Sequence, residues 1–222
     1  MSSFPSPSHK KSSRIHNSDW HPEPTKSLPL NAARQALVND ILALYSCEPT
    51  VDRIKRYTPD CVYDDQFVFV NDRYRMAGQW FALPKLFRES RTVAYQVVRS
   101  DEEVIQVRNK QSWTFQNLPQ KSATISSLIT LSLDPETVSS DFIRVKHHKD
   151  QANEQDYSHH LLSFTFKKWQ AGQVAKHIME SPEIETFRED KRGGSEQLGE
   201  RKYGERRDEE EHEELGFIME DC

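Results

Sequence analysis

The sequence predicts an α+β domain in which helices come first and an antiparallel sheet follows. Residues 31–45 place apolar side chains at helical spacing, whereas residues 92–148 alternate apolar and polar side chains with a period of two. Short turn-like stretches separate the alternating runs, which is typical of consecutive antiparallel strands. The chain of 222 residues is long enough for one ordinary domain and one hydrophobic core.

The N-terminal half predicts three helices and one strand. Asn31 is expected to cap the first helix, and residues 51–57 predict a short second helix after Pro49. Residues 61–70, "CVYDDQFVFV", are aromatic and β-branched and predict a strand that ends at Asn71 and Asp72. Residues 76–90 predict the third helix, in which Pro84 has to lie in a first turn or cause a kink.

The C-terminal half predicts a meander of four strands. These strands are expected at residues 93–98, 105–115, 123–133 and 143–148. In the second strand Asn109 and Gln111 interrupt an otherwise apolar face, and in the last strand Ile143, Val145 and His147 are expected to share one face. Buried amides need hydrogen-bond partners, so Asn109 and Gln111 either orient a ligand or lie where the strand bends into solvent.

Composition divides the chain into a core and two polar ends. Residues 1–30 are rich in Ser, Pro, Lys and His and predict a disordered arm, and residues 31–152 predict the folded domain. Residues 153–187 fit either a helix capped by Ser158 or a strand, and we favour a helical extension. Residues 188–222 are strongly charged and predict a disordered acidic tail.

Several classes of function lack their usual sequence signals. The net charge of −5 gives no argument for nucleic-acid binding, and no apolar run approaches the length of a membrane span. The three cysteines have no zinc-type spacing, and there is no glycine-rich phosphate loop. We therefore expect no metal, no cofactor, no nucleic-acid partner and no membrane partner. We expect reduced thiols and a cytoplasmic or nuclear location, without secretion.

Three motifs make residues 31–152 similar to a known superfamily. They are "RIKRYTPDCVYDD", "RYRMAGQWFALPKLF" and "IRVKHHKD", in which His148 and Asp150 match a pattern that continues to an aromatic residue where this chain has Ala152. With this order of helices and strands, the chain resembles the SnoaL-like branch of the nuclear transport factor 2-like superfamily. The following "NEQDYSHHLL" is similar to an extension in uncharacterised fungal members of that branch.

The resemblance implies a cone: a curved antiparallel sheet wrapped around the N-terminal helices, with an apolar pocket at its open end. Family members include ketosteroid isomerases and polyketide cyclases, so one expectation is a small apolar ligand in the cone, with isomerase, cyclase or dehydratase activity. Other members bind proteins or form dimers through the outer sheet, so the alternative is a non-catalytic interaction module that forms a homodimer.

The resemblance also nominates a site. The position of "Val62-Tyr63-Asp64" matches the segment that carries the general base in ketosteroid isomerases, which implies that Asp64 is the base, while Asp65 should point to the opposite face of the strand. A structural role for Asp64, in a turn or against a backbone N–H, is the alternative. The isomerases also use a tyrosine on the first helix, and this chain has none there before Tyr45.

The expected ligand-binding residues are aromatic and polar side chains around the cone: Tyr63, Trp80, Tyr95, Asn109, Gln111, Trp113 and His147.

Overall fold

The computed structural model describes residues 20–65, 69–116, 122–152 and 181–192. Its strands are β1 (Tyr57–Asp64), β2 (Phe69–Val70), β3 (Phe87–Ser100), β4 (Val104–Phe115), β5 (Ser122–Leu133) and β6 (Val145–Ala152). They form one sheet in the order β2-β1-β6-β5-β4-β3. The α+β prediction is confirmed, but the sheet is mixed, because β1 and β6 run parallel.

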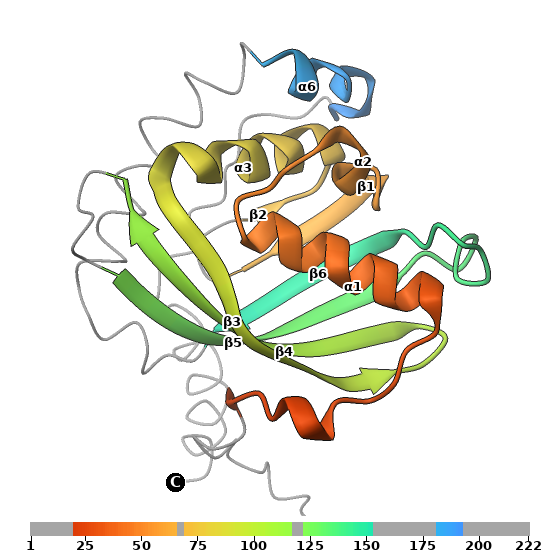
Figure 1. Cartoon of the computed structure of the whole chain (residues 1–222). Coiled ribbons are helices and arrows are strands. Elements are labelled where there is room, and N and C mark those ends of the chain that lie inside the picture. Colours follow the sequence, from red (N-terminus) through yellow and green to blue (C-terminus); the bar gives the residue numbers. More distant parts are fainter. Residues whose placement is uncertain (1–19, 66–68, 117–121, 153–180, 193–222) are drawn as a thin grey trace, which may run out of the picture.

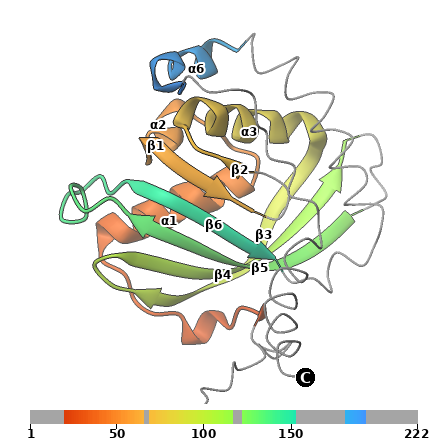
Figure 2. The ribbon, with the colours of Figure 1, turned by 180° about the vertical axis from the view of Figure 1, so that it is seen from behind.

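Three helices accompany this sheet: α1 (Ala32–Tyr45), α2 (Val51–Ile54) and α3 (Arg73–Leu86). Asn31 caps α1 as predicted, since its Oδ1 accepts a hydrogen bond from the N–H of Arg34 at 2.9 Å. The sheet curves around α1, and α3 lies beyond the β1 side of the sheet (Figures 1 and 2). In the part of the chain that the structure describes, no helix is long and apolar enough to cross a membrane.

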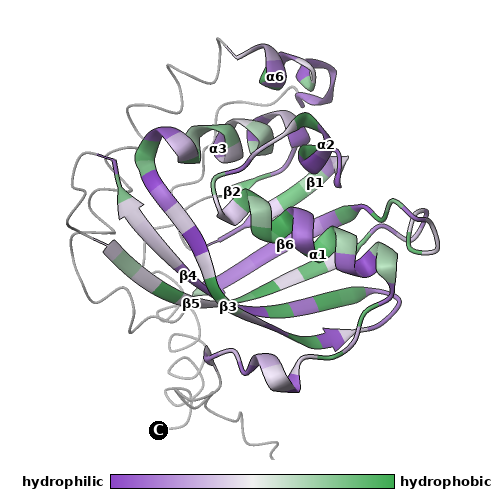
Figure 3. Cartoon of the chain, viewed as in Figure 1, coloured by the Kyte–Doolittle hydropathy of each residue, from purple (hydrophilic) through white to green (hydrophobic). Residues whose placement is uncertain are grey.

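The alternation of the meander appears clearly in β4. Ile105, Val107, Asn109 and Gln111 are buried, and the residues between them are only half-buried. Figure 3 shows hydrophilic and hydrophobic residues alternating along the strands. Because successive side chains of a strand point to opposite faces, the buried set of β4 defines the inner face that α1 covers.

Three predicted boundaries were wrong. The single strand expected at residues 61–70 is divided between β1, which begins earlier at Tyr57, and the short β2. The third helix begins at Arg73 because Asp72 caps it through the N–H of Arg75 at 2.7 Å. It ends at Leu86, and Pro84 lies in its last turn rather than in a first turn.

An extra residue in β6 changes which histidine faces inward. Val145 pairs with Leu133 of β5, but His147 pairs with Ser132, so Lys146 is inserted between two successive pairs. The insertion shifts the alternation by one position. His148 is therefore fully buried, whereas His147 is half-buried and lies on the outer face. The predicted inward position of His147 was wrong for this reason.

Part of the expected N-terminal arm has a defined position. Residues 20–30 include the 3₁₀ turn η2 (Pro24–Lys26) and run beside the edge strand β3. The N–H of Leu28 donates to the carbonyl of Val97 at 3.0 Å, and the N–H of Glu23 donates to Oε1 of Gln96 at 2.9 Å. The disordered arm predicted for residues 1–30 therefore does not extend through residues 20–30, and residues 1–19 lie outside the described range.

A segment near the C-terminus packs on α3. It consists of α6 (Pro182–Glu185) and the 3₁₀ turn η6 (Arg188–Asp190), seen above α3 in Figure 1. Ile184 and Phe187 are buried in the core, and Nε of Arg73 contacts Oδ2 of Asp190 at 2.7 Å. The boundary predicted at residue 188 thus falls inside a packed segment. Most of the helical extension expected at 153–187 lies outside the described residues.

Candidate functional site

A cluster of aromatic side chains surrounds His148 on the inner side of the sheet. Tyr57 and Tyr63 come from β1, Tyr45 ends α1, and Trp80 comes from α3. The ring centroids of Tyr63 and His148 are 4.9 Å apart, and those of Tyr45 and Trp80 are 5.2 Å apart. Both pairs meet edge to face, an arrangement that adds to the stability gained from burial. The cluster therefore fixes the position of the buried imidazole.

A chain of hydrogen bonds runs through this cluster and ends at Asp150. The hydroxyl of Tyr45 donates to Oδ2 of Asp150 at 2.6 Å, and its oxygen lies 3.1 Å from Nε2 of His148. The hydroxyl of Tyr57 lies 2.9 Å from Nδ1 of His148. Because the proton of Tyr45 is directed to Asp150, its oxygen accepts from Nε2–H, and Nδ1 accepts from Tyr57. Protons are thus donated in sequence from Tyr57 to His148, Tyr45 and Asp150.

The ionisation states agree with this direction. Burial lowers the pKa of His148 to about 3, and the charge of His147 acts in the same sense, so the imidazole is neutral at physiological pH. Burial raises the pKa of Asp150 to about 6, although interactions with the hydroxyls of Tyr45 and Ser127 oppose the shift. Burial also raises the pKa of Tyr45, so its hydroxyl keeps the proton. Of these three groups, Asp150 is the one whose protonation changes nearest neutral pH.

Three polar atoms near this chain are buried without a hydrogen-bond partner among the described residues. They are Oδ1 of Asp150, Oδ1 of Asn109 and Nε1 of Trp80. A buried polar group without a partner costs about 1–3 kcal/mol, so such atoms mark places where a ligand or water is expected. Two of the three are acceptors and only one is a donor.

Gln111 differs from Asn109 because both the oxygen and the nitrogen of its side-chain amide have hydrogen-bond partners. Its Nε2 donates to the carbonyl of Tyr45 at 3.2 Å and to Oγ of Ser90 at 2.8 Å. Its Oε1 accepts from Oγ1 of Thr92 at 2.9 Å. Gln111 thus holds the end of α1 against the sheet, which is a structural task. Asn109 donates weakly to Gln111 at 3.4 Å and keeps a free carbonyl oxygen.

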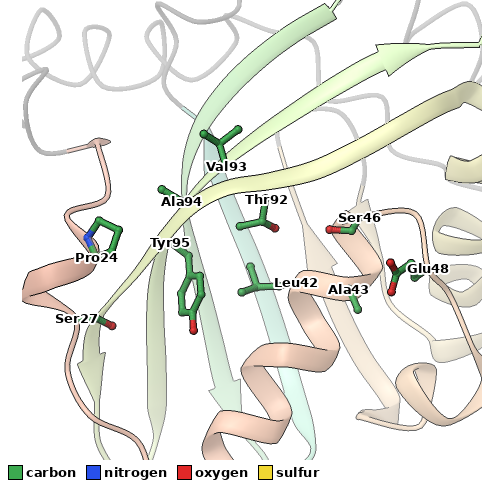
Figure 4. Close-up of a pocket in the computed structure, with 10 residues that line it drawn as sticks. All are labelled: Pro24, Ser27, Leu42, Ala43, Ser46, Glu48, Thr92, Val93, Ala94 and Tyr95. Carbon is green, nitrogen blue, oxygen red and sulfur yellow. The ribbon is translucent and has the colours of Figure 1, made fainter.

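An open pocket of about 540 Å³ lies between α1, β3 and the N-terminal segment. Leu42 of α1 and Thr92 and Tyr95 of β3 lie toward one another there (Figure 4). Tyr95 pairs directly with Asn109 in the sheet register. The free oxygen of Asn109 is therefore one strand away from this pocket.

The expected base, Asp64, does not belong to the cluster. Tyr63 faces His148, and the hydroxyl of Tyr63 donates to Oδ2 of Asp65 at 3.0 Å. Asp64 lies between Tyr63 and Asp65 in the chain, and it is aligned with Lys149 in the register of β1 and β6. Since alternate residues of a strand share a face, Asp64 is on the side away from Tyr63 and His148. The opposite orientation of the two aspartates was expected, but Asp65 rather than Asp64 contacts a residue of the cluster, Tyr63.

The other expected ligand residues are divided between the cluster and its border. Tyr63 and Trp80 belong to the cluster, and Asn109 has the free oxygen described above. Tyr95 lines the pocket, and its hydroxyl accepts from Nε2 of Gln35 at 3.4 Å. Trp113 packs against Phe87, with ring centroids 4.6 Å apart, and closes the β3–β4 end of the core.

Sequence reasoning did not nominate Tyr45, Tyr57, His148 or Asp150. The available signal was the spacing of His148, Asp150 and Ala152, because residues two apart on a strand share a face. Within the described residues, no group of three or more His, Cys, Asp or Glu side chains is placed to hold a metal ion.

The comparison with solved structures found proteins that are similar to this chain at low sequence identity. An NTF2-like protein from Anabaena variabilis is 8% identical, with a TM-score of 0.45, and the match covers 55% of this chain and 87% of that chain. A protein with a ketosteroid isomerase-like fold from Catenulispora acidiphila is 9% identical, with a TM-score of 0.41, over 51% of this chain and 82% of that chain. These matches are similarities of this chain to NTF2-like and ketosteroid isomerase-like structures.

A third similar structure is an LEH-like epoxide hydrolase from M. tuberculosis, which is 14% identical. Its TM-score is 0.44, and the match covers 62% of this chain and 96% of that chain. No protein-family model matches the sequence, and no curated protein matches it. At these identities and TM-scores the likeness carries no argument about function, so the chemistry has to be argued from the residues of this chain.

Proposed function

We propose that the inner face of the sheet binds a small, largely apolar molecule and exchanges a proton with it at Oδ1 of Asp150. The observation that carries this proposal is the hydrogen-bond chain from Tyr57 through His148 and Tyr45, which ends at a carboxylate with one free, buried oxygen. An acid or base works best when its pKa is near the working pH, and Asp150 has a pKa of about 6.

The surroundings of Asp150 support the apolar part of the proposal. Tyr45, Trp80 and Trp113 present ring surfaces within one connected cluster, with the centroids of Tyr45 and Trp113 6.5 Å apart. Ligand sites in proteins are commonly apolar and aromatic, with a few polar groups that fix orientation. The proposal assigns the chain to the SnoaL-like branch, with isomerase, cyclase or dehydratase chemistry in which Asp150 replaces Asp64 as the acid/base residue.

A substitution pair tests this assignment. A thermal-shift screen with ketosteroids and polyketide-like compounds would identify ligands, and each would be assayed for turnover with Asp150→Asn and Asp64→Asn. General acid/base help is worth about 10²–10⁴ in rate, so Asp150→Asn should lose turnover by at least about a hundredfold while ligand still binds. Asp64→Asn should keep most of the turnover. Equal rates for Asp150→Asn and the wild type would remove Asp150 from the mechanism.

The interaction-module alternative makes a different prediction about the outer face. A homodimer through the outer sheet needs that face to be accessible, but the N-terminal segment contacts two of its residues: Glu23 meets Gln96, and Nδ1 of His21 lies 3.4 Å from Oγ of Ser126. A dimer through this part of the sheet would have to displace residues 20–27. Light scattering of the full chain measures the oligomeric state directly, and a dimer would favour the alternative.

A further inference from the structure

Most hydrogen-bond donors of the interior site already have acceptors, whereas two of its acceptors have no donor. The proton of Tyr57 goes to His148, that of His148 to Tyr45, and that of Tyr45 to Asp150. The two N–H groups of the Gln111 amide go to the carbonyl of Tyr45 and the hydroxyl of Ser90. The buried polar atoms without a partner in the described residues are the acceptors Oδ1 of Asp150 and Oδ1 of Asn109, the donor Nε1 of Trp80, and the hydroxyl of Thr58, which can donate or accept.

The two free acceptors belong to the same face of the sheet. Asp150 pairs with Ile129, and Asn109 pairs with Ser127, two residues earlier on the same strand β5. Side chains two apart on a strand share a face, so Asn109, Ser127 and Asp150 form a polar diagonal across β4, β5 and β6. Apolar side chains lie beside this diagonal, since Val107 and Ile129 are both buried.

The free acceptors and the engaged donors determine which functional group of a ligand the site can bind. A ligand carbonyl, or an oxyanion derived from one, needs donors, and a pair of acceptor oxygens would repel it. A ligand hydroxyl can donate to a free carboxylate oxygen and satisfy it. The described residues place no Lys or Arg within ion-pair distance of Asp150, so the carboxylate has no cation there that would weaken it as an acceptor.

We infer that the ligand of this site presents a hydroxyl group to Oδ1 of Asp150, with Asn109 as a second acceptor, rather than a carbonyl group to a set of donors. The inference rests on the proposed function and specifies its substrate class: small, largely apolar alcohols or phenols. In the corresponding proton transfer the O–H bond of the ligand breaks, the proton moves to Oδ1 of Asp150, and the electron pair stays on the ligand oxygen, which becomes a nucleophile.

Three probes with one carbon skeleton test the inference: 1-indanol, 1-indanone and indane. Binding would be followed by NMR through the indole Nε1–H signal of Trp80, assigned with Trp80→Phe, because this group lies in the cluster. At pH 7.5 we expect 1-indanol to bind the wild type at least about tenfold more tightly than 1-indanone, as one satisfied buried acceptor allows.

The variant Asp150→Asn sharpens the test. Its amide oxygen can still accept from Tyr45, and its NH₂ group then takes the place of Oδ1, so an acceptor becomes a donor. The preference should therefore reverse in favour of 1-indanone. Asn109→Leu should lower the affinity for 1-indanol severalfold. Asp52→Asn is the control, because that carboxylate is 86% exposed on α2, and it should leave all three affinities unchanged.

The possible outcomes distinguish a failure of the hydroxyl inference from a failure of the proposed function. If 1-indanone binds the wild type as tightly as 1-indanol does, the hydroxyl inference is overturned, while binding of apolar molecules at the inner face stands. If none of the three probes moves the Trp80 signal at millimolar concentrations, the proposed function fails as well. If Asp150→Asn does not fold, the ratio of alcohol to ketone affinity in the wild type and in Asn109→Leu decides the inference.

Discussion

Replacing Asp150 with Asn should change how the stability of the protein depends on pH. Burial raises the pKa of Asp150 from 3.8 to about 6 in the folded chain. Between these values the unfolded chain releases a proton that the folded chain retains, so raising the pH favours unfolding. The shift corresponds to about 3 kcal/mol of unfolding free energy, which the wild type loses between about pH 4 and pH 7.

Asn does not titrate, so the variant should not lose this stability. We expect the free energy of unfolding of Asp150→Asn, relative to the wild type, to increase by about 3 kcal/mol from pH 4 to pH 7. Urea denaturation of both proteins at several pH values measures this difference, and the titration of His148 contributes to both curves and largely cancels. A difference that stays constant across this range would show that Asp150 is not held in a buried environment, and it would refute the reasoning.

Further substitutions test the buried contacts one by one. Asn109→Leu should stabilise the ligand-free protein by about 1 kcal/mol in urea denaturation, because it removes an acceptor that has no partner. Gln111→Leu should destabilise it by about 1–3 kcal/mol in the same assay, because the carbonyl of Tyr45 loses its Gln111 donor and the hydroxyl of Thr92 loses its acceptor. Phe187→Ala should cost about 3–5 kcal/mol and lower the melting temperature if residues 181–192 are part of the core, whereas an unchanged melting temperature would place them outside it. Tyr57→Phe should cost about 1 kcal/mol by calorimetry and leave Nδ1 of His148 without its donor, and ¹⁵N NMR of the imidazole would detect the change.

The helices and the meander could be predicted because their signals are local. The cap at Asn31 and the apolar spacing that follows it predict the two ends of α1 to within one turn of helix. The alternation of β4 gave its inner face correctly through Gln111. The first strand was less well predicted, because the extent of β1 depends on pairing with β6, which is about 85 residues away in the sequence.

The site was predicted only in part, because its members meet through the fold. Trp80 and Tyr63 were found as large aromatic residues of apolar runs, a property of their own segments. Asp150 is exposed to a low-dielectric interior only because β6 lies at the centre of the sheet beside β1. The outward orientation of Asp64 is a consequence of the inward orientation of Tyr63, because neighbouring residues on a strand face opposite sides of the sheet.

The insertion at Lys146 has a consequence for comparing this chain with relatives. A single amino acid decides which of two consecutive histidines enters the interior, so an in-frame loss of one codon there would exchange His147 for His148 without altering either residue. A sequence alignment without a gap in β6 would therefore place His147 opposite a residue that faces inward in proteins that lack the insertion. The equivalence of residues in this strand has to be established by superposing backbones rather than by matching letters.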